Sequence, residues 1–195
     1  TVLGIALVVA VYLLVQALAL GLESSSANTG DPRNVLVVRK GSTAESSSLV
    51  QREHLRTLQY SPDIARNDEG QPIISADVIV LATAARKATH VGEANVLIRG
   101  LSPRGIELRP QVKLVAGLDK EGREVASRWF TPGKREIVVA KRLAARFANF
   151  NIGGTFKTGP DRLTIVGWLD AGKSAFDSEC WMDADECRAM FDRDM

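Results

Sequence analysis

Histidine and cysteine, the side chains that most often serve as nucleophiles, general bases and zinc ligands, are scarce: the 195 residues contain two of each. Cys180 and Cys187 lack the neighbouring Cys or His of a zinc site. On one helix they would be about 10 Å apart along the axis, too far for a disulfide. His54 and His90 lie in polar surroundings, remote from each other. We therefore predict two small core cysteines, no metal site and no catalytic site.

Charged side chains are absent from residues 1–22, although they make up 25% of the sequence. As a helix, this stretch would span about 33 Å, enough to cross a hydrocarbon core of about 30 Å. It also lacks the polar stripe of a soluble core helix. We therefore predict a transmembrane helix. A cleaved signal peptide is the alternative, but no basic start precedes the apolar run.

The segment after the apolar stretch has no basic residue before Arg33. Because cytoplasmic flanks favour Lys and Arg close to the membrane, the remainder is predicted to lie on the outer side. We expect three parts: a transmembrane helix at 1–22, a juxtamembrane connector at 23–34 and an extracytoplasmic domain at 35–195. The net charge of +2 is nearly balanced and argues against a nucleic-acid partner.

Short β-branched runs mix with short helical patterns along the expected domain. Strands are predicted at 35–39, 73–81, 95–100, 112–117, 137–140 and 163–169. Helices are predicted at 49–59, with Ser48 and Gln51 as a capping box, at 141–147, and after Asp183, with Glu186 in its first turn. Because no regular strand–helix–strand repeat is present, the pattern predicts a mixed α+β domain, with two lobes.

One stretch satisfies the phosphate-binding pattern G-x-x-x-x-G-K-[ST], through Gly167, Gly172, Lys173 and Ser174. The pattern needs a small-residue loop followed by a long helix. Here Trp and Leu follow the first glycine and extend an apolar strand, and Asp170 would place a negative charge beside the phosphates. No helical stripe follows. We interpret the match as chance and predict no nucleotide or other cofactor at these residues.

Three other groups of polar residues have simple interpretations. Ser174, Ser178 and Cys180, as possible nucleophiles, form with the two histidines a scattered set of a kind that most sequences contain. The basic stretches at 86–90 and 141–146 are predicted to be solvated faces. An acidic cluster lacks the spacing and central glycine of a calcium loop; it consists of Asp177, Glu179, Asp183, Asp185 and Glu186.

Several blocks in a fixed order carry a family resemblance. They are the uncharged first helix, "NVLIRGLSPRGIELRP", "VKLVAG", "RWFTPGKREIVVAKRLAARFANFNIGGTF" and "LTIVGWLDAGKSAFDSECWMDADE". This succession resembles the permease subunit of ABC transporters of the MacB and FtsX-like superfamily. It covers the first transmembrane helix and most of the large periplasmic core domain. One departure is "LDKEGREVAS" at 118–127, which is expected to be an inserted hairpin or loop.

The resemblance implies a non-catalytic membrane subunit in a bacterial inner membrane. It implies a second permease protomer, a cytosolic ABC ATPase that drives movement of the outer domain, surrounding lipid and, in some members, a periplasmic adaptor protein. It also implies that the core domain is incomplete here and that further transmembrane helices follow. The alternative is a single-pass anchored binding or sensor domain without an ATPase partner.

Overall fold

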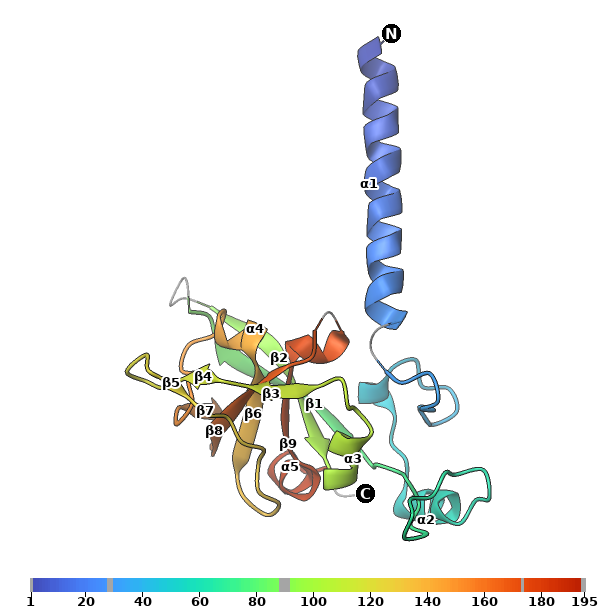
Figure 1. Ribbon diagram of the computed structural model, residues 1–195, viewed down its shortest axis with the longest axis vertical. Coiled ribbons are helices and arrows are strands. Elements are labelled where there is room, and N and C mark those ends of the chain that lie inside the picture. The colour runs from blue at the N-terminus through green and yellow to red at the C-terminus, as the bar shows by residue number, and fades with distance from the viewer. Residues whose placement is uncertain (1, 28–29, 88–91, 173, 194–195) are drawn as a thin grey trace.

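The first element of the computed structural model is a long helix, α1 (Val2–Ala27), which rises away from the rest of the protein (Figure 1). The structure describes residues 2–27, 30–87, 92–172 and 174–193. The stretch Val2–Glu23 has a mean hydropathy of 2.6, and none of its apolar window is buried. Its length and composition suit a membrane span, and so large an exposed apolar surface is unusual for a soluble monomer.

Residues 30–77, which we call the linker, are mostly irregular and contain η1 (Glu45–Ser47) and α2 (Arg52–Gln59). The predicted strand at 35–39 is wrong: this apolar run is exposed and pairs with no described strand. A β-branched sequence forms a strand only where a partner edge receives it. The predicted helix is present, but it begins at Arg52, and the Ser48 hydroxyl accepts a hydrogen bond from the Arg39 amide instead of capping it.

The domain after the linker is built on one mixed sheet in the order β1-β2-β9-β6-β8-β3, with β7 paired to the same edge of β8 as β3. Parallel pairing joins β2 to β9 and β6 to β8, and the other pairs are antiparallel. The strands are β1 (Val78–Ala85), β2 (Glu93–Leu101), β3 (Lys113–Val115), β6 (Glu136–Ala140), β7 (Thr155–Thr158), β8 (Asp161–Asp170) and β9 (Glu179–Asp183).

The region at 118–127 is a small hairpin of β4 (Gly117–Leu118) and β5 (Glu124–Val125). Asp119 and Gly122 form its turn, and Gly122 has a φ of 79°, which a glycine adopts without strain. The expected hairpin or loop is therefore a two-stranded hairpin.

The short helices lie at opposite ends of the sheet. Because β1, β6 and β8 run against β2 and β9, the helices after β6 and β8 share one end: α4 (Lys141–Ala144) and η2 (Ala175–Ser178). The helices after β2 and β9 share the other end: α3 (Pro103–Glu107) and α5 (Ala184–Met190). Figure 1 shows α4 at the end nearer α1 and α5 at the far end. The predicted cap of α5 is confirmed, since Asp183 accepts a hydrogen bond from the Glu186 amide at 3.2 Å.

The core lies around β9, a strand that the sequence analysis missed. All five of its residues are buried, and it runs between β2 and β6 in the middle of the sheet. A strand covered on both faces shows no alternation, so its pattern gives no period-two signal. Cys180 and Cys187 are buried free thiols, as predicted. Together, the apolar helix and the mixed sheet confirm the predicted α+β class.

We expect Gly100→Ala to destabilise the domain, because β2 packs directly on α5 at this residue. A Cβ at position 100 would lie 2.7 Å from the Cys187 Cβ and 3.1 Å from the Ala184 Cα. Overpacking of this kind costs about 1–3 kcal/mol. Thermal unfolding of the detergent-solubilised protein measures the loss. Gly30→Ala is the control, since no atom of the described residues would lie within 4 Å of its added Cβ, and an equal melting temperature for both variants would contradict the packing argument.

Candidate functional site

A buried arginine of β2 lies on the face of the sheet opposite the one that packs on α5. Arg99 lies between Ile79 of β1 and Trp181 of β9 in the strand register, and its side chain is 5% exposed. Its neighbours in β2, Ile98 and Gly100, point to the opposite face, where Gly100 packs on α5. A guanidinium in this position loses its water and must find charged or polar partners within the protein.

The strongest partner of Arg99 is Glu179, the first residue of β9. The two side chains form a bidentate pair, with Nε to Oε2 at 2.7 Å and Nη2 to Oε1 at 2.8 Å. Glu179 is itself 6% exposed and also accepts a hydrogen bond from the Trp181 indole nitrogen at 3.0 Å. Two parallel charge-assisted bonds fix the orientation of the guanidinium as well as its position.

The remaining partners of Arg99 come from the linker. Its Nη1 donates to Glu45 of η1 at 2.8 Å and to Asp77, directly before β1, at 3.2 Å. Glu45 and Asp77 stand near the two ends of a segment that includes α2. Arg99 therefore closes a loop of chain onto the sheet, and α2 lies to the side of the sheet (Figure 1).

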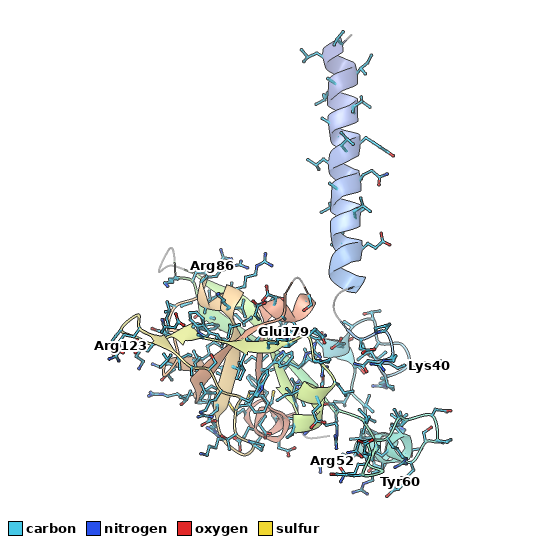
Figure 2. The ribbon with its side chains drawn as sticks, in the orientation of Figure 1. Lys40, Arg52, Tyr60, Arg86, Arg123 and Glu179 are labelled. Carbon is cyan, nitrogen blue, oxygen red and sulfur yellow. The ribbon has the colours of Figure 1, made fainter. Side chains whose placement is uncertain are left out.

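A second arginine completes the site. Arg109 donates to the same Asp77 oxygen as Arg99 and to the Gly105 carbonyl at 2.7 Å. The guanidinium carbons of both arginines lie over the Phe176 ring, at 5.4 Å for Arg99 and 5.2 Å for Arg109. We call Arg99, Arg109, Glu45, Asp77 and Glu179 the Arg99 cluster; Figure 2 labels Glu179 within the body of the domain.

The Arg99 cluster keeps its arginine charged. Burial by itself disfavours the charged guanidinium, but hydrogen bonds to Glu179 and the charges of Glu179, Glu45 and Asp77 outweigh it and raise the pKa of Arg99 above its ordinary value. Among the described residues, no buried side-chain nitrogen or oxygen lacks a hydrogen-bond partner. A fully paired network of this kind favours a single arrangement of linker and sheet.

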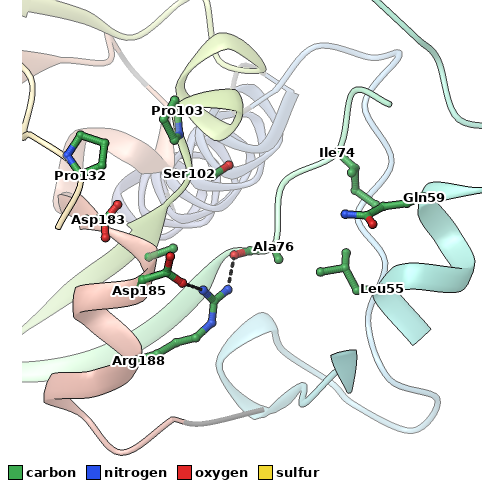
Figure 3. A pocket seen from close by; sticks show the side chains of 11 residues that line it. Leu55, Gln59, Ile74, Ala76, Ser102, Pro103, Pro132, Asp183, Asp185 and Arg188 are labelled. Carbon is green, nitrogen blue, oxygen red and sulfur yellow. Dashed lines mark hydrogen bonds and ion pairs between the residues drawn. The ribbon is translucent and has the colours of Figure 1, made fainter. Parts of the chain in front are cut away.

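Further contacts hold the linker against α3 and α5. The Asn34 side-chain Nδ2 donates to the Leu108 carbonyl at 2.8 Å, and the Arg104 guanidinium donates to the Gln71 side chain at 3.0 Å. Arg188 bridges Asp185 of its own helix and the Ala76 carbonyl (Figure 3). Between these contacts lies a cleft of about 410 Å³ that separates α2 from α5.

The phosphate-loop match falls across a strand end. Gly167 and Asp170 belong to β8, and the Asp170 carboxylate accepts a hydrogen bond from the Gly172 amide at 2.8 Å. A Cβ at position 167 would lie 2.6 Å from the Arg128 carbonyl, so that glycine serves strand packing. Ser174 precedes the four-residue η2 and donates to Ala171, whereas Lys173 lies outside the described residues. The interpretation of the match as chance stays a prediction.

The other predicted groups are dispersed. His54 is exposed on α2, His90 lies outside the described residues, and burial raises the pKa of the Cys187 thiol to about 12. The acidic residues have separate partners among the described side chains and backbone groups: Asp177 with Arg142, Glu179 with Arg99, Asp183 with the Glu186 backbone amide, Asp185 with Arg188 and Glu186 with Arg135.

The sequence did not mark the Arg99 cluster as a site. The sequence does contain one signal, an arginine inside the apolar run "NVLIRG". If this run forms a buried strand, the charge of that arginine is buried with it. Such a residue requires an acidic partner, but the sequence does not say which of 23 acidic residues supplies it.

Comparison with known proteins gives one family, and two similar solved structures illustrate the fold. Residues 1–194 match the family described as MacB-like periplasmic core domain. The extracellular domain of the noncanonic ABC-type transporter YknZ from Gram-positive bacteria is similar at 15% identity and a TM-score of 0.51, covering 74% of this chain and 67% of that domain. The periplasmic region of MacB from Actinobacillus actinomycetemcomitans has 12% identity and a TM-score of 0.39, covering 66% and 52%.

No curated protein matches the chain. The chain spans about two thirds of the YknZ domain and about half of the MacB periplasmic region. The likeness to the YknZ domain shows a shared fold, and the family match extends from the apolar helix through the sheet.

Two of the three carboxylates of the Arg99 cluster, Glu179 and Glu45, should differ in their contribution to stability. Glu179→Ala leaves a buried guanidinium without its bidentate partner, and we expect a loss of about 3–5 kcal/mol. Glu45 is 36% exposed, so Glu45→Ala should cost less than about 1 kcal/mol. Urea unfolding of the detergent-solubilised protein measures both. A larger loss for Glu45 than for Glu179 would refute the assigned order.

Proposed function

The chain belongs to the MacB-like periplasmic core domain family, and from this premise we propose that it is the first membrane helix and part of the outer domain of an ABC transporter permease. The family makes it a permease-type component, a class that is generally non-catalytic. The exposed apolar α1 supports an anchor in the membrane. We infer that the domain lies outside the cytoplasm and that a cytosolic ABC ATPase powers its movement.

The observation that carries this proposal is the Arg99 cluster. The linker connects α1 to β1. Its residues Glu45 and Asp77 both accept hydrogen bonds from Arg99 of β2, and Arg99 is held in turn by Glu179 of β9. A displacement of α1 would therefore be transmitted to the middle of the sheet instead of being absorbed by a slack connection. In this view the chain acts as a lever in an export or force-transmitting cycle, together with a second permease protomer and, in some systems, a periplasmic adaptor.

The proposed topology has a direct test. We expect a cysteine introduced at the exposed Thr43 to react with a membrane-impermeant thiol reagent on intact spheroplasts. The native Cys180 and Cys187 are 0% exposed, and burial raises the pKa of both, so they give little background. Labelling of Thr43→Cys only after lysis would place the domain on the cytoplasmic side.

The coupling test uses the full-length gene product, purified with the ATPase that accompanies it and reconstituted in nanodiscs. A fluorophore at Lys120→Cys, on the β4–β5 turn, reports domain movement on addition of ATP. We expect Glu45→Gln to reduce the ATP-dependent signal severalfold while the rate of ATP hydrolysis is unchanged, because the linker then holds the sheet less firmly. Glu53→Gln on α2 is the matched control: an exposed linker acid for which the structure describes no ion pair.

A covalent bond separates a mechanical role from a general loss of structure. Cysteines at Asn34 and Leu108, which are in hydrogen-bond contact, can be joined by a short bifunctional thiol reagent. We expect this link to restore the ATP-dependent signal of Glu45→Gln. An unchanged signal in Glu45→Gln would overturn the lever, and failure of the full-length protein to associate with any ATPase would favour the anchored binding domain.

A further inference from the structure

The two basic stretches that the sequence analysis treated as separate solvated faces meet in the folded domain. Arg86, at the end of β1, forms an isolated β-bridge with Phe147, just after α4. The Lys87 amide donates to the Arg146 carbonyl at 2.9 Å, and the Ala148 amide donates to the Ala85 carbonyl at 3.0 Å. The backbone itself therefore holds the segments at 85–87 and 146–148 side by side.

Five exposed basic side chains of these segments and of the adjoining α4 form one surface, which we call the basic patch: Arg86, Lys87, Lys141, Arg142 and Arg146. Arg142 approaches Asp177 at 3.9 Å. Within the part of the chain that the structure describes, the other four make no ion pair. Three acidic residues lie at the same end of the sheet, namely Glu93, Asp170 and Asp177. Lys113 lies opposite Asp170 at the same end, so six positive charges against three negative ones leave an excess of 6 − 3 = +3 among these residues.

The basic patch faces the end of the domain from which α1 rises. Topology places the end of β1, the start of β2, α4 and η2 at one end of the sheet. Figure 1 shows this end near the level of the lower end of α1, with α5 at the opposite end. In Figure 2 the Arg86 label stands at the upper surface of the domain, on the side toward which α1 extends.

We propose that the basic patch docks on anionic phospholipid headgroups of the membrane that α1 spans. Exposed Lys and Arg side chains are attracted to an anionic bilayer surface within about a Debye length, roughly 8–10 Å. A tethered domain meets this surface at high effective concentration, so even a weak contact is populated. This inference takes from the proposed function only that α1 spans a membrane.

A lipid surface suits this patch better than an acidic protein partner. The patch consists of long, flexible side chains on short turns and a one-turn helix, and these can adapt to a fluid array of phosphates. The cleft described above, which offers a shaped surface, lies beside α5 at the other end of the sheet. The patch itself offers no such shaped surface. Binding of the patch to an acidic protein is the alternative that the test below distinguishes.

The test measures how close the patch lies to lipid in the full chain. A bimane fluorophore is attached at Ala145→Cys, between Lys141 and Arg146, and the protein is reconstituted in two kinds of vesicle. One is phosphatidylcholine alone, and the other is three parts phosphatidylcholine to one part phosphatidylglycerol; both carry a headgroup spin-label quencher. We expect stronger quenching with phosphatidylglycerol and loss of the difference at high salt.

Charge variants identify the residues responsible. Each basic residue near an anionic surface changes the docking equilibrium by about fivefold, so Lys87→Gln/Arg146→Gln should lower it by roughly twenty-five-fold and abolish the phosphatidylglycerol effect. Lys134→Gln/Arg193→Gln removes the same charge from outside the patch and should leave the quenching unchanged. Thermal melting shows whether each variant is folded.

The remaining outcomes overturn one proposal or the other. Equal quenching in both vesicles, or equal quenching in the two double variants, would reject lipid docking. Quenching that stays low in both vesicles but changes when an acidic partner protein is added would assign the patch to that protein. If alkaline carbonate extracts the protein from the vesicles, α1 does not span the membrane and the proposed function fails; retention with lipid-independent quenching rejects the inference alone.

Discussion

The buried guanidinium of Arg99 is the constraint on which the rest of the structure depends. A charge with 5% of its side chain exposed is tolerable only when carboxylates surround it. The three that do so come from β9, from η1 within the linker and from the end of the linker before β1. A well-packed apolar side chain could provide similar stability, but it would attract no particular partner. The ion pairs instead select one path for the linker, and that path fixes where the chain from α1 meets the sheet.

Elements with strong local signals could be predicted from the sequence. The uncharged run at 1–22 gave α1, the β-branched runs gave β2, β6 and β8, and the Asp183 cap with Glu186 gave the start of α5. In each case the residues that determine the element lie within it or beside it. The expected hairpin or loop at 118–127 behaves similarly, since Gly122 within it stands at positive φ in the turn.

Elements that depend on distant partners could not be predicted in this way. The run at 35–39 has the composition of a strand but no edge to join, whereas β9 has a mixed composition and occupies the centre of the sheet. The Arg99 cluster gathers residues 54 and 80 positions apart, a fact that only the folded register reveals. Prediction from local propensity thus failed where contacts between distant segments decide the structure. The Arg99 cluster consists of such contacts.

The buried cluster and the basic patch act at different strengths, and this difference bears on movement. Within the cluster, Arg99 and Glu179 are buried and Asp77 is 15% exposed, so ions screen these pairs less than they screen the patch. The patch is exposed, so its contacts are weak and salt-sensitive. A domain held only by the linker could swing about that attachment, and a second weak contact at the membrane edge would set its resting tilt. Because the weaker contact yields first, a pull from α1 would lift the patch from the lipid before it loosened the linker.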